Sequence, residues 1–501
     1  MSFSRNFESI SRRTLLGGAA GLAGAVAFGR SAFAQDATAV AKTGVDPTKW
    51  NTETINALAG TITVDTQAEL HALVPPDQVT GDLSFWNAGP VESTPQIMKD
   101  FYDEFLSQFS TWYPNANLDN QNVNYNDLLD KLRTAAAGGA APDVAKMPIL
   151  WGVEFAARGD LQEIVLEDYG LSKELFWEGA LKSVTWEGKY YGIPTNNETM
   201  AFIWNKDLFA QAGLDPENPP ATWADVVAYS KQIKDTTGAF GYGMVAKVNA
   251  GNTPFRFMPM LWAYGSSALD EAEANPTMQT TMINNEGGVA ALQNMYDMYV
   301  RDRSVPTSAL TNTQVENQDL FISGQVAMMI AHPSEYATMQ QKLAEATGDE
   351  QVLAQKVVDN MSYGLIPEGP VRRSVVFGGS NAHIFTDETT GGVNQMGAKA
   401  LVAALTSPEW ALKNNWTDSN PANLRGFETE YMAQRLAEIK FLEVTTSMLP
   451  YGVPFPVVPE STEIMNIIVP EMLQNALTET MSVQEAADDA AARITELISG
   501  T

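Results

Sequence analysis

Polar side chains stand directly before a short apolar run near the middle of the chain. Asn196, Asn197 and Glu198 precede Thr199–Trp204, a run of apolar and β-favouring residues that is long enough for one buried strand. Amide and carboxylate groups can hydrogen-bond to the hydroxyl groups of a ligand. Asn205 comes next and is a typical N-cap, which predicts that a helix begins there. We therefore expect a strand that crosses between two lobes, with polar groups at the mouth of the cleft between them.

Further candidate residues lie after other expected strands, because ligands of open α/β folds bind in the crevice at the carboxyl ends of the strands. Aromatic rings can stack on the apolar faces of sugar rings, and amide, carboxylate and hydroxyl groups can bond to sugar hydroxyls. The candidate set therefore predicts a carbohydrate site. Beyond Asn196–Glu198 the candidates are Trp86, Asn87, Glu92, Trp151, Phe255, Arg256, Trp262, His332, Ser334, Tyr451 and an expected backbone-rich turn of Gly378, Gly379, Ser380 and Asn381.

Several of these residues also have a simpler structural interpretation. Trp86 and Trp262 suit the core of a lobe, and Glu198 suits a solvated rim. A single histidine such as His332 is more often structural than functional. Arg256 can either bind an anionic group or pair with a carboxylate. The sequence leaves both interpretations open for each of these residues.

The composition argues against several classes of function. The chain has 501 residues and a formal net charge of −29, which disfavours binding to nucleic acid or to anionic lipid. Its hydrophobic content of 45% is that of a globular protein, and its length suggests two or more domains. It contains no cysteine, and its three histidines lack metal-ligand spacing, so we expect neither a metal nor another cofactor. No nucleophile-elbow, zinc-protease or Walker motif is present, whereas a carboxylate pair of the glycosidase kind stays open.

Residues 1–34 are typical of a twin-arginine signal peptide. Arg12 and Arg13 precede the apolar run Leu15–Phe28, and Ala32–Ala34 fits the A-x-A cleavage rule. The apolar run is too short to span a bilayer. The absence of a lipidation cysteine favours a periplasmic location over a membrane tether. Residues 35–80 follow as an extension with two short expected helices, to which we assign no function.

Expected strands and helices alternate after this extension. Asp82–Trp86 and Asn115–Gln121 are predicted strands, and Thr94–Phe109 and Tyr125–Ala137 are predicted helices. This order indicates parallel strands covered by helices. Later elements are Ser362–Pro367 and Val375–Phe385, expected as strands of the first lobe, and Val393–Leu405, Glu463–Leu477 and Val483–Ile498, expected as helices.

Three sequence blocks resemble the extracellular solute-binding proteins of family 1, the maltose-binding-like group that feeds ABC importers. The blocks are GKYYGIP at 188–194, FIWNKDLFAQAGL at 202–214 and PPATWADVVAYSKQI at 219–233. A fourth segment, DLFISGQVAMMI at 319–330, is similar to another part of the same pattern. The resemblance extends from about residue 82 to residue 498.

This resemblance implies an α/β, two-lobed periplasmic binding protein fold of the type II-like form, with discontinuous lobes joined by a hinge. We expect residues 81–198 and 336–392 in lobe 1 and residues 199–335 and 393–501 in lobe 2, with crossings near 196–204 and 330–336. The resemblance also implies a monomer that is not an enzyme. Such a protein captures a mono- or oligosaccharide in the periplasm and delivers it to the transmembrane subunits of an ABC permease.

The resemblance also bears on individual residues. Glu198 stands where the group carries an acidic residue that contacts sugar. Met147 and Ser334 stand where aromatic residues commonly line the sugar cleft, which favours a smaller or differently substituted saccharide. Two other functions stay open, namely a secreted glycan-cleaving enzyme and a binder of an anionic sugar derivative carrying phosphate or sulfonate.

Overall fold

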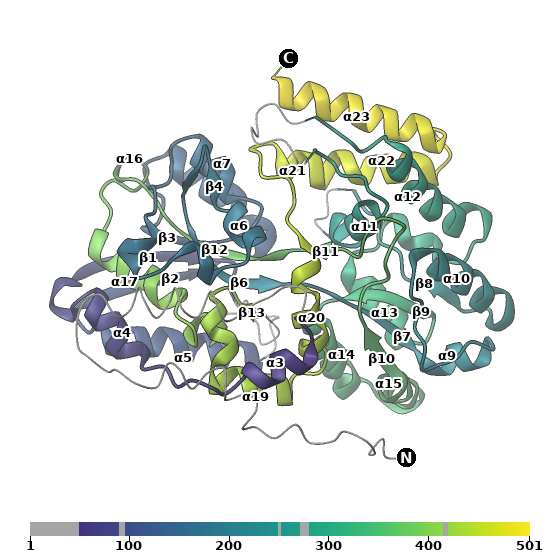
Figure 1. Cartoon of the computed structure of the whole chain (residues 1–501), viewed down its shortest axis with the longest axis horizontal. Helices are drawn as coiled ribbons and strands as arrows, with labels where there is room; N and C mark the ends of the chain where they lie inside the picture. Colours follow the sequence, from purple (N-terminus) through teal and green to yellow (C-terminus); the bar gives the residue numbers. More distant parts are fainter. Residues whose placement is uncertain (1–49, 90–95, 249–251, 271–279, 414–418, 501) are drawn as a thin grey trace.

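The computed structural model describes residues 50–89, 96–248, 252–270, 280–413 and 419–500. Two sheets organise this part of the chain, and Figure 1 shows them side by side, each in its own lobe. The six-stranded sheet has the order β13-β6-β12-β3-β1-β2, and the four-stranded sheet has the order β10-β7-β9-β8. The predicted two-lobed α/β fold is confirmed.

The first lobe is built on the six-stranded sheet, in which β1 pairs in parallel with β2 and β3, and β12 lies antiparallel between β3 and β6. Helices α5 and α17 bury apolar side chains against one face, and α6 and α7 cover the other. The elements are β1 (Gly81–Asn87), α5 (Gln96–Trp112), β2 (Ala116–Asn122), α6 (Tyr125–Ala137), β3 (Val144–Pro148), α7 (Gly152–Ala157), α8 (Glu178–Lys182), β6 (Ile193–Glu198), β12 (Gly378–Ile384), α17 (Gln395–Leu405) and β13 (Asn420–Pro421).

The second lobe surrounds the four-stranded sheet. Its strand β7 pairs antiparallel with β9 and β10, and β8 runs parallel to β9. The elements are β7 (Ala201–Asn205), α9 (Lys206–Gln211), α10 (Trp223–Thr237), β8 (Phe240–Tyr242), α11 (Asn252–Ala263), α12 (Glu286–Tyr296), α13 (Gln314–Ile322), β9 (Val326–Ala331), α14 (Pro333–Glu345), α15 (Gly348–Asn360), β10 (Met361–Gly364), α22 (Val469–Leu477) and α23 (Val483–Ser499).

Local sequence signals set several helix boundaries. The Asn205 side chain accepts hydrogen bonds from the backbone N–H groups of Asp207 and Leu208, which confirms the predicted N-cap of α9. Thr222 caps α10 through a capping box with Asp225. These bonds satisfy N–H groups that have no partner within the helix, and α9 begins where the sequence predicts.

The first crossing between the lobes lies where we expected it, and the second does not. Only Thr199 and Met200 separate β6 from β7, so the chain passes from one sheet into the other within two residues. After β9, however, α14, α15 and β10 stay with the second lobe, and β10 pairs with β7. The expected return near 330–336 and the assignment of residues 362–367 to the first lobe are therefore wrong. Periodicity identifies a strand but not its partner, and here β10 covers the free edge of β7.

The chain re-enters the first lobe at β12 and then crosses a third time. The helix α17 packs on the first lobe, contrary to the expected assignment of all residues after 392 to the second lobe. The chain then runs through α19 (Glu430–Glu438), α20 (Leu442–Met448) and β14 (Gly452–Val453) before α22 and α23 close the second lobe. The strand β14 pairs in parallel with β11 (Val375–Val376), so the second and third crossings are hydrogen-bonded to each other.

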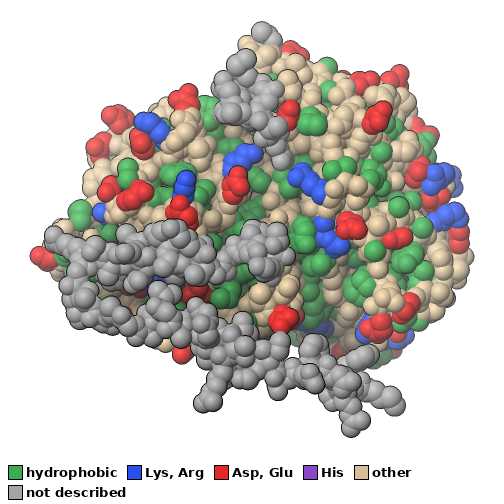
Figure 2. Space-filling model, viewed as in Figure 1, with side chains coloured by type: hydrophobic (Ala, Val, Ile, Leu, Met, Phe, Trp, Pro, Cys, Tyr) green, Lys and Arg blue, Asp and Glu red, His purple; other side chains and the backbone are tan. Residues whose placement is uncertain are grey.

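The described part of the N-terminal extension packs on the molecule. Two short helices, α3 (Thr52–Leu58) and α4 (Thr66–Leu73), lie where the sequence predicts them. The helix α4 packs against α17, and Arg425 pairs with Glu69 at 3.0 Å. Figure 2 shows acidic side chains scattered over the visible face of both lobes. Within the described ranges, no helix is both long enough and apolar enough to cross a membrane.

A buried histidine makes the stability of the fold depend on pH. The His383 ring is fully buried, its Nδ1 atom lies 2.8 Å from the Tyr191 carbonyl oxygen, and burial lowers its pKa from 6.5 to about 4. The unfolded chain therefore binds more protons between pH 6.5 and 4. We expect the free energy of unfolding to fall by about 3 kcal/mol across this window from His383 alone. Thermal unfolding from pH 7 to pH 4 measures the effect. A His383→Gln variant that loses stability as steeply as the wild type would contradict it.

A glycine in β12, where this strand pairs with β6, leaves no room for a side chain. Gly379 has φ +128°, and a Cβ atom there would lie 2.0 Å from the Asn196 carbonyl oxygen. Gly379→Ala should therefore destabilise the protein by about 2–4 kcal/mol, through backbone strain and through displacement of β6 from β12. Gly159→Ala is the matched control, because its φ is +78° and no atom lies within 4 Å. Urea unfolding measures the loss of stability in each variant. Equal losses of stability in the two variants would contradict the predicted steric overlap at Gly379.

Candidate ligand-binding cleft

The polar residues at the strand ends lie along one edge of the six-stranded sheet. Strands β1, β2, β3 and β6 end at this edge, and β12, which is antiparallel to β3 and β6, begins there. In the register of the sheet, Asn87 lies opposite Lys146, Ser380 lies opposite Asn196, and Gly378 lies opposite Glu198. The chain crosses into the second lobe directly after Glu198. The edge therefore faces the second lobe.

Glu198 is held in a hydrogen-bonded group at this edge. Its Oε1 atom accepts a bond from Asn196 Nδ2 at 3.0 Å and from Ser419 Oγ at 3.1 Å. Asn196 and Ser419 are buried, whereas Glu198 is half-buried. The two donors orient the carboxylate. The sequence did not single out Ser419, since it stands far from Glu198 along the chain.

Lys146 is a second charged group at the edge that the sequence analysis missed. It is buried in β3, opposite Asn87 and Ala382. Burial lowers its pKa from 10.5 to about 7, although the nearby charge of Glu198 acts in the opposite direction. The only signal in the sequence was a lysine inside the otherwise apolar run of β3. Around pH 7 this side chain can either donate as a cation or act as a neutral amine.

Amide side chains surround the end of β1. Asn87 is buried and donates from Nδ2 to Asn120 Oδ1 at 3.0 Å and to Asn122 Oδ1 at 3.1 Å. Trp86 is half-buried on the opposite face of the sheet, where the Lys131 ammonium lies 4.2 Å from the centre of a Trp86 ring. Asn120 and Asn122 were not among the predicted site residues, although the sequence predicted a strand at 115–121.

The expected turn at 378–381 is instead the beginning of the central strand β12. Gly378, Gly379 and Ser380 pair with β6, with a bulge before Asn381. The Asn381 side chain points to the other face and donates to Ser183 Oγ at 3.1 Å. The Asn197 side chain is also directed away from Glu198 and donates to the Pro421 carbonyl at 3.4 Å. Alternation along the strands therefore divides the predicted residues between two faces.

The second lobe presents aromatic groups to this edge. The rings of Phe255 and His332 lie 5.9 Å apart, and Phe255 also packs on Phe455 at 5.0 Å. A Cβ atom on Gly378 would lie 3.4 Å from Phe255 Cε1, so a ring of one lobe touches the edge of the other. Burial and the charge of Arg256 lower the pKa of His332 to about 3, which keeps the ring neutral. The cleft is thus bounded by a polar edge and an aromatic wall.

Arg256 belongs to an ion pair inside the second lobe. Its Nη2 atom lies 2.5 Å from Glu335 Oε1, and the two side chains are only 3% and 2% exposed. Glu335 also accepts a bond from the His332 backbone N–H, as part of the capping box of α14. Of the two interpretations that the sequence left open for Arg256, the pairing with a carboxylate is the one observed.

Other predicted residues lie away from the edge. Trp262 is fully buried in the second lobe, and Trp151 is buried under α6 and α7 in the first. Tyr451 is 40% exposed in the third crossing, where the Arg373 guanidinium lies 5.9 Å from its ring. Glu92 and the side chain of Ser334 lie outside the part of the chain that the structure describes.

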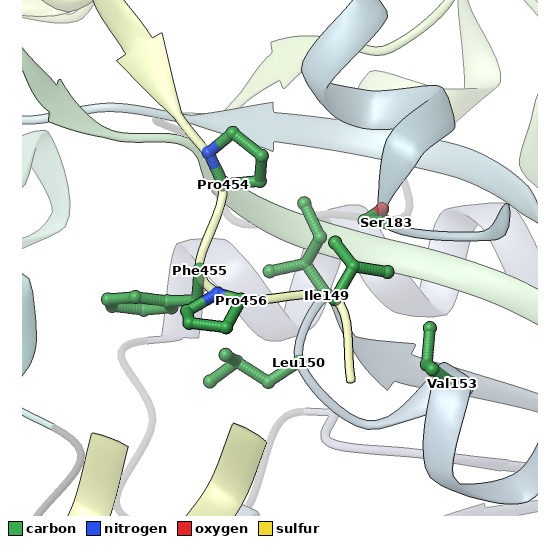
Figure 3. A pocket seen from close by; sticks show the side chains of 8 residues that line it. Ile149, Leu150, Val153, Ser183, Pro454, Phe455 and Pro456 are labelled. Carbon is green, nitrogen blue, oxygen red and sulfur yellow. The ribbon is translucent and has the colours of Figure 1, made fainter. Parts of the chain in front are cut away.

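A pocket opens next to this edge, between the loop after β3 and the proline-rich segment after β14. Figure 3 shows Pro454, Phe455 and Pro456 beside Ile149 and Leu150. The volume of this pocket, including the part that is open to solvent, is about 230 Å³. This is smaller than the roughly 300–1,000 Å³ of typical ligand pockets. The lining is apolar except for Ser183, the partner of Asn381.

Comparison with known proteins identifies the family of this chain. The sequence profile of the bacterial extracellular solute-binding proteins matches residues 91–412. A protein of Brucella abortus (strain 2308), whose name gives only a binding function, is 25% identical over 371 residues, which cover 73% of this chain and 82% of that protein.

Solved structures share the fold at low sequence identity. An ABC transporter solute-binding protein from Thermotoga lettingae, solved with α-D-tagatose, has a TM-score of 0.67 and 21% identity, and the match covers 84% of this chain and 100% of that one. UgpB from Mycobacterium tuberculosis, solved with glycerophosphocholine, has a TM-score of 0.65 and 17% identity over 84% and 98% of the two chains. The profile match covers more than half of the chain, and the chain therefore belongs to the bacterial extracellular solute-binding protein family.

Proposed function

We propose that the protein is the substrate-binding component of an ABC importer and that it captures a mono- or oligosaccharide in the cleft between its lobes. The observation that carries this proposal is the Glu198 carboxylate, which Asn196 and Ser419 orient at an edge facing the Phe255–His332 wall. A carboxylate accepts hydrogen bonds from ligand hydroxyls, and an aromatic wall suits the apolar face of a sugar ring.

The mechanism is a shift of population between open and closed arrangements of the lobes. A ligand that touches both the sheet edge and the Phe255 wall binds the closed arrangement more tightly and so favours it. The closed form is then presented to the transmembrane subunits of the permease. A micromolar dissociation constant corresponds to about −8 kcal/mol, a scale suited to scavenging.

The charges in the cleft favour a neutral ligand over an anionic one. Glu335 neutralises Arg256, and the Glu198 carboxylate would repel a phosphate or sulfonate. Lys146 instead favours an anionic ligand, because a cation at the edge would suit an anionic sugar derivative. The two solved structures described above were determined with different ligand classes, a neutral sugar in one and a phosphodiester in the other. An anionic sugar derivative is therefore the second candidate.

The location and the partners follow from the same proposal. The twin-arginine pattern lies in residues 1–34, outside the described ranges, and with the family it supports a periplasmic protein. We further propose a monomer that needs no cofactor, does not bind nucleic acid and does not turn over its ligand. A secreted glycan-cleaving enzyme is the rival class, and new reducing ends after incubation with polysaccharides would favour it.

A thermal-shift panel tests the ligand class. Neutral mono- and oligosaccharides, polyols, amino acids, sugar phosphates and glycerophosphodiesters are added at matched concentration. At a hundredfold excess over its dissociation constant, a true ligand should stabilise the protein by about 2.7 kcal/mol. We expect shifts with neutral sugars. Shifts confined to phosphorylated compounds would support the second candidate, and shifts confined to amino acids would contradict both.

Substitution of Glu198 tests the proposed site. Loss of a charged hydrogen bond costs about 1.5–3 kcal/mol, so Glu198→Ala should weaken sugar binding about 10- to 100-fold in calorimetry. Glu163→Ala is the control, because it removes a carboxylate of the same lobe whose partner is the exposed Lys189. Unchanged affinity in a folded Glu198→Ala protein would remove this carboxylate from the site.

A further inference from the structure

The segment before the first lobe is anchored behind the hinge by one tryptophan. Trp50 is 7% exposed, and its indole N–H donates to the Thr446 carbonyl oxygen at 2.8 Å. Its ring packs edge-on against Trp177, with the ring centres 5.5 Å apart, and against Phe427 at 5.0 Å. Ile55 of α3 is fully buried in the same cluster. A single short segment thus touches the α8 region, the segment before α19, and α20.

The helix α20 is bonded to the first crossing and to the first sheet. Thr199, one of the two residues between β6 and β7, donates to the Thr445 carbonyl oxygen at 2.5 Å. Thr446 donates to Asn420 Oδ1 in β13 at 2.5 Å. The carbonyl group of Thr446 is the one that receives the Trp50 indole, so Trp50 acts on the helix that supports the crossing.

The residue before α20 is anchored in the second lobe. Phe441 packs edge-on against Tyr336 of α14 at 5.1 Å and against Tyr363 of β10 at 4.4 Å. It has φ +79°, a left-handed conformation that is uncommon for a bulky residue. The segment from Phe441 to Met448 therefore bridges the two lobes.

This bridge lies beside the first crossing and the edge strand β13, because Thr445 accepts a bond from Thr199 and Thr446 donates to Asn420. Figure 1 shows α3 and α20 together between the lobes. A rotation that opens or closes the cleft must move the bridge relative to at least one lobe, because the bridge is attached to both.

We propose that residues 50–58 form a hinge strap, a segment that clamps α20 to the first lobe and so restricts rotation of the lobes. Trp50 and Ile55 supply the buried contacts, and the Thr52 hydroxyl lies 3.4 Å from Ser447 Oγ. The strap thereby sets how far the ligand-free protein departs from the arrangement seen here. This proposal goes beyond the proposed function and does not depend on which ligand the cleft takes.

Double electron–electron resonance, which measures the distance between two spin labels, tests the strap on ligand-free protein. The chain has no cysteine, so Asp130→Cys in α6 and Glu286→Cys in α12, both exposed, give one labelled pair across the cleft. In the Trp50→Ala background we expect the interlobe distance distribution to widen. Trp112→Ala is the matched control, because Trp112 is 4% exposed and packs edge-on against Trp410 within the first lobe.

Two outcomes would overturn the proposal. The first is a Trp50→Ala distribution as narrow as that of the wild type, with only a lower unfolding temperature. The second is equal widening in the Trp112→Ala protein. Trp50→Phe keeps the aromatic packing and removes only the bond to Thr446, so it stays informative if Trp50→Ala does not fold. We expect this variant to widen the distribution less than Trp50→Ala, and no widening would also count against the strap.

Discussion

The geometry of this protein depends on the direct passage of one extended segment from the first sheet into the second. Thr199 and Met200 are both buried and lie between β6 and β7, so neither sheet can shift along its strands without disturbing the other. The last residue before this passage is Glu198. Its carboxylate is therefore positioned by both lobes as well as by its hydrogen-bond partners. A side chain placed at a crossing is therefore sensitive to the relative arrangement of the lobes.

The charged groups near the polar edge lie close to groups of opposite charge. Arg256 and Glu335 are almost fully buried, and a buried charge is tolerated only when it is paired and hydrogen-bonded. Their pairing fixes α11 against α14 and so places Phe255 and His332 at the wall of the cleft. Lys146 and Glu198 influence each other at the polar edge. Electrostatic interactions in this region thus help to position the aromatic residues of the second lobe.

The sequence predicted much of the fold because its signals are local. Capping at Asn205, the alternation of strands and helices up to α6, and the motifs of the solute-binding family all needed only neighbouring residues. The errors concern pairing at long range. Nothing near residues 361–364 indicates that β10 joins β7, and the glycines at 378–379 suggested a turn because sequence alone cannot reveal that β6 and β3 flank them. The same limit hid Ser419 and Lys146, whose roles depend on residues distant in the chain.

Strand β12 lies in the interior of the first sheet, although it begins almost two hundred residues after β6. The second lobe likewise takes α22 and α23 from the C-terminal end of the chain. Contacts at such sequence separation form only after long loops have closed, which slows the search for the native state. Neither lobe can therefore complete its fold while only its first residues have been synthesised. The nascent chain cannot fold fully until nearly all of it has been made.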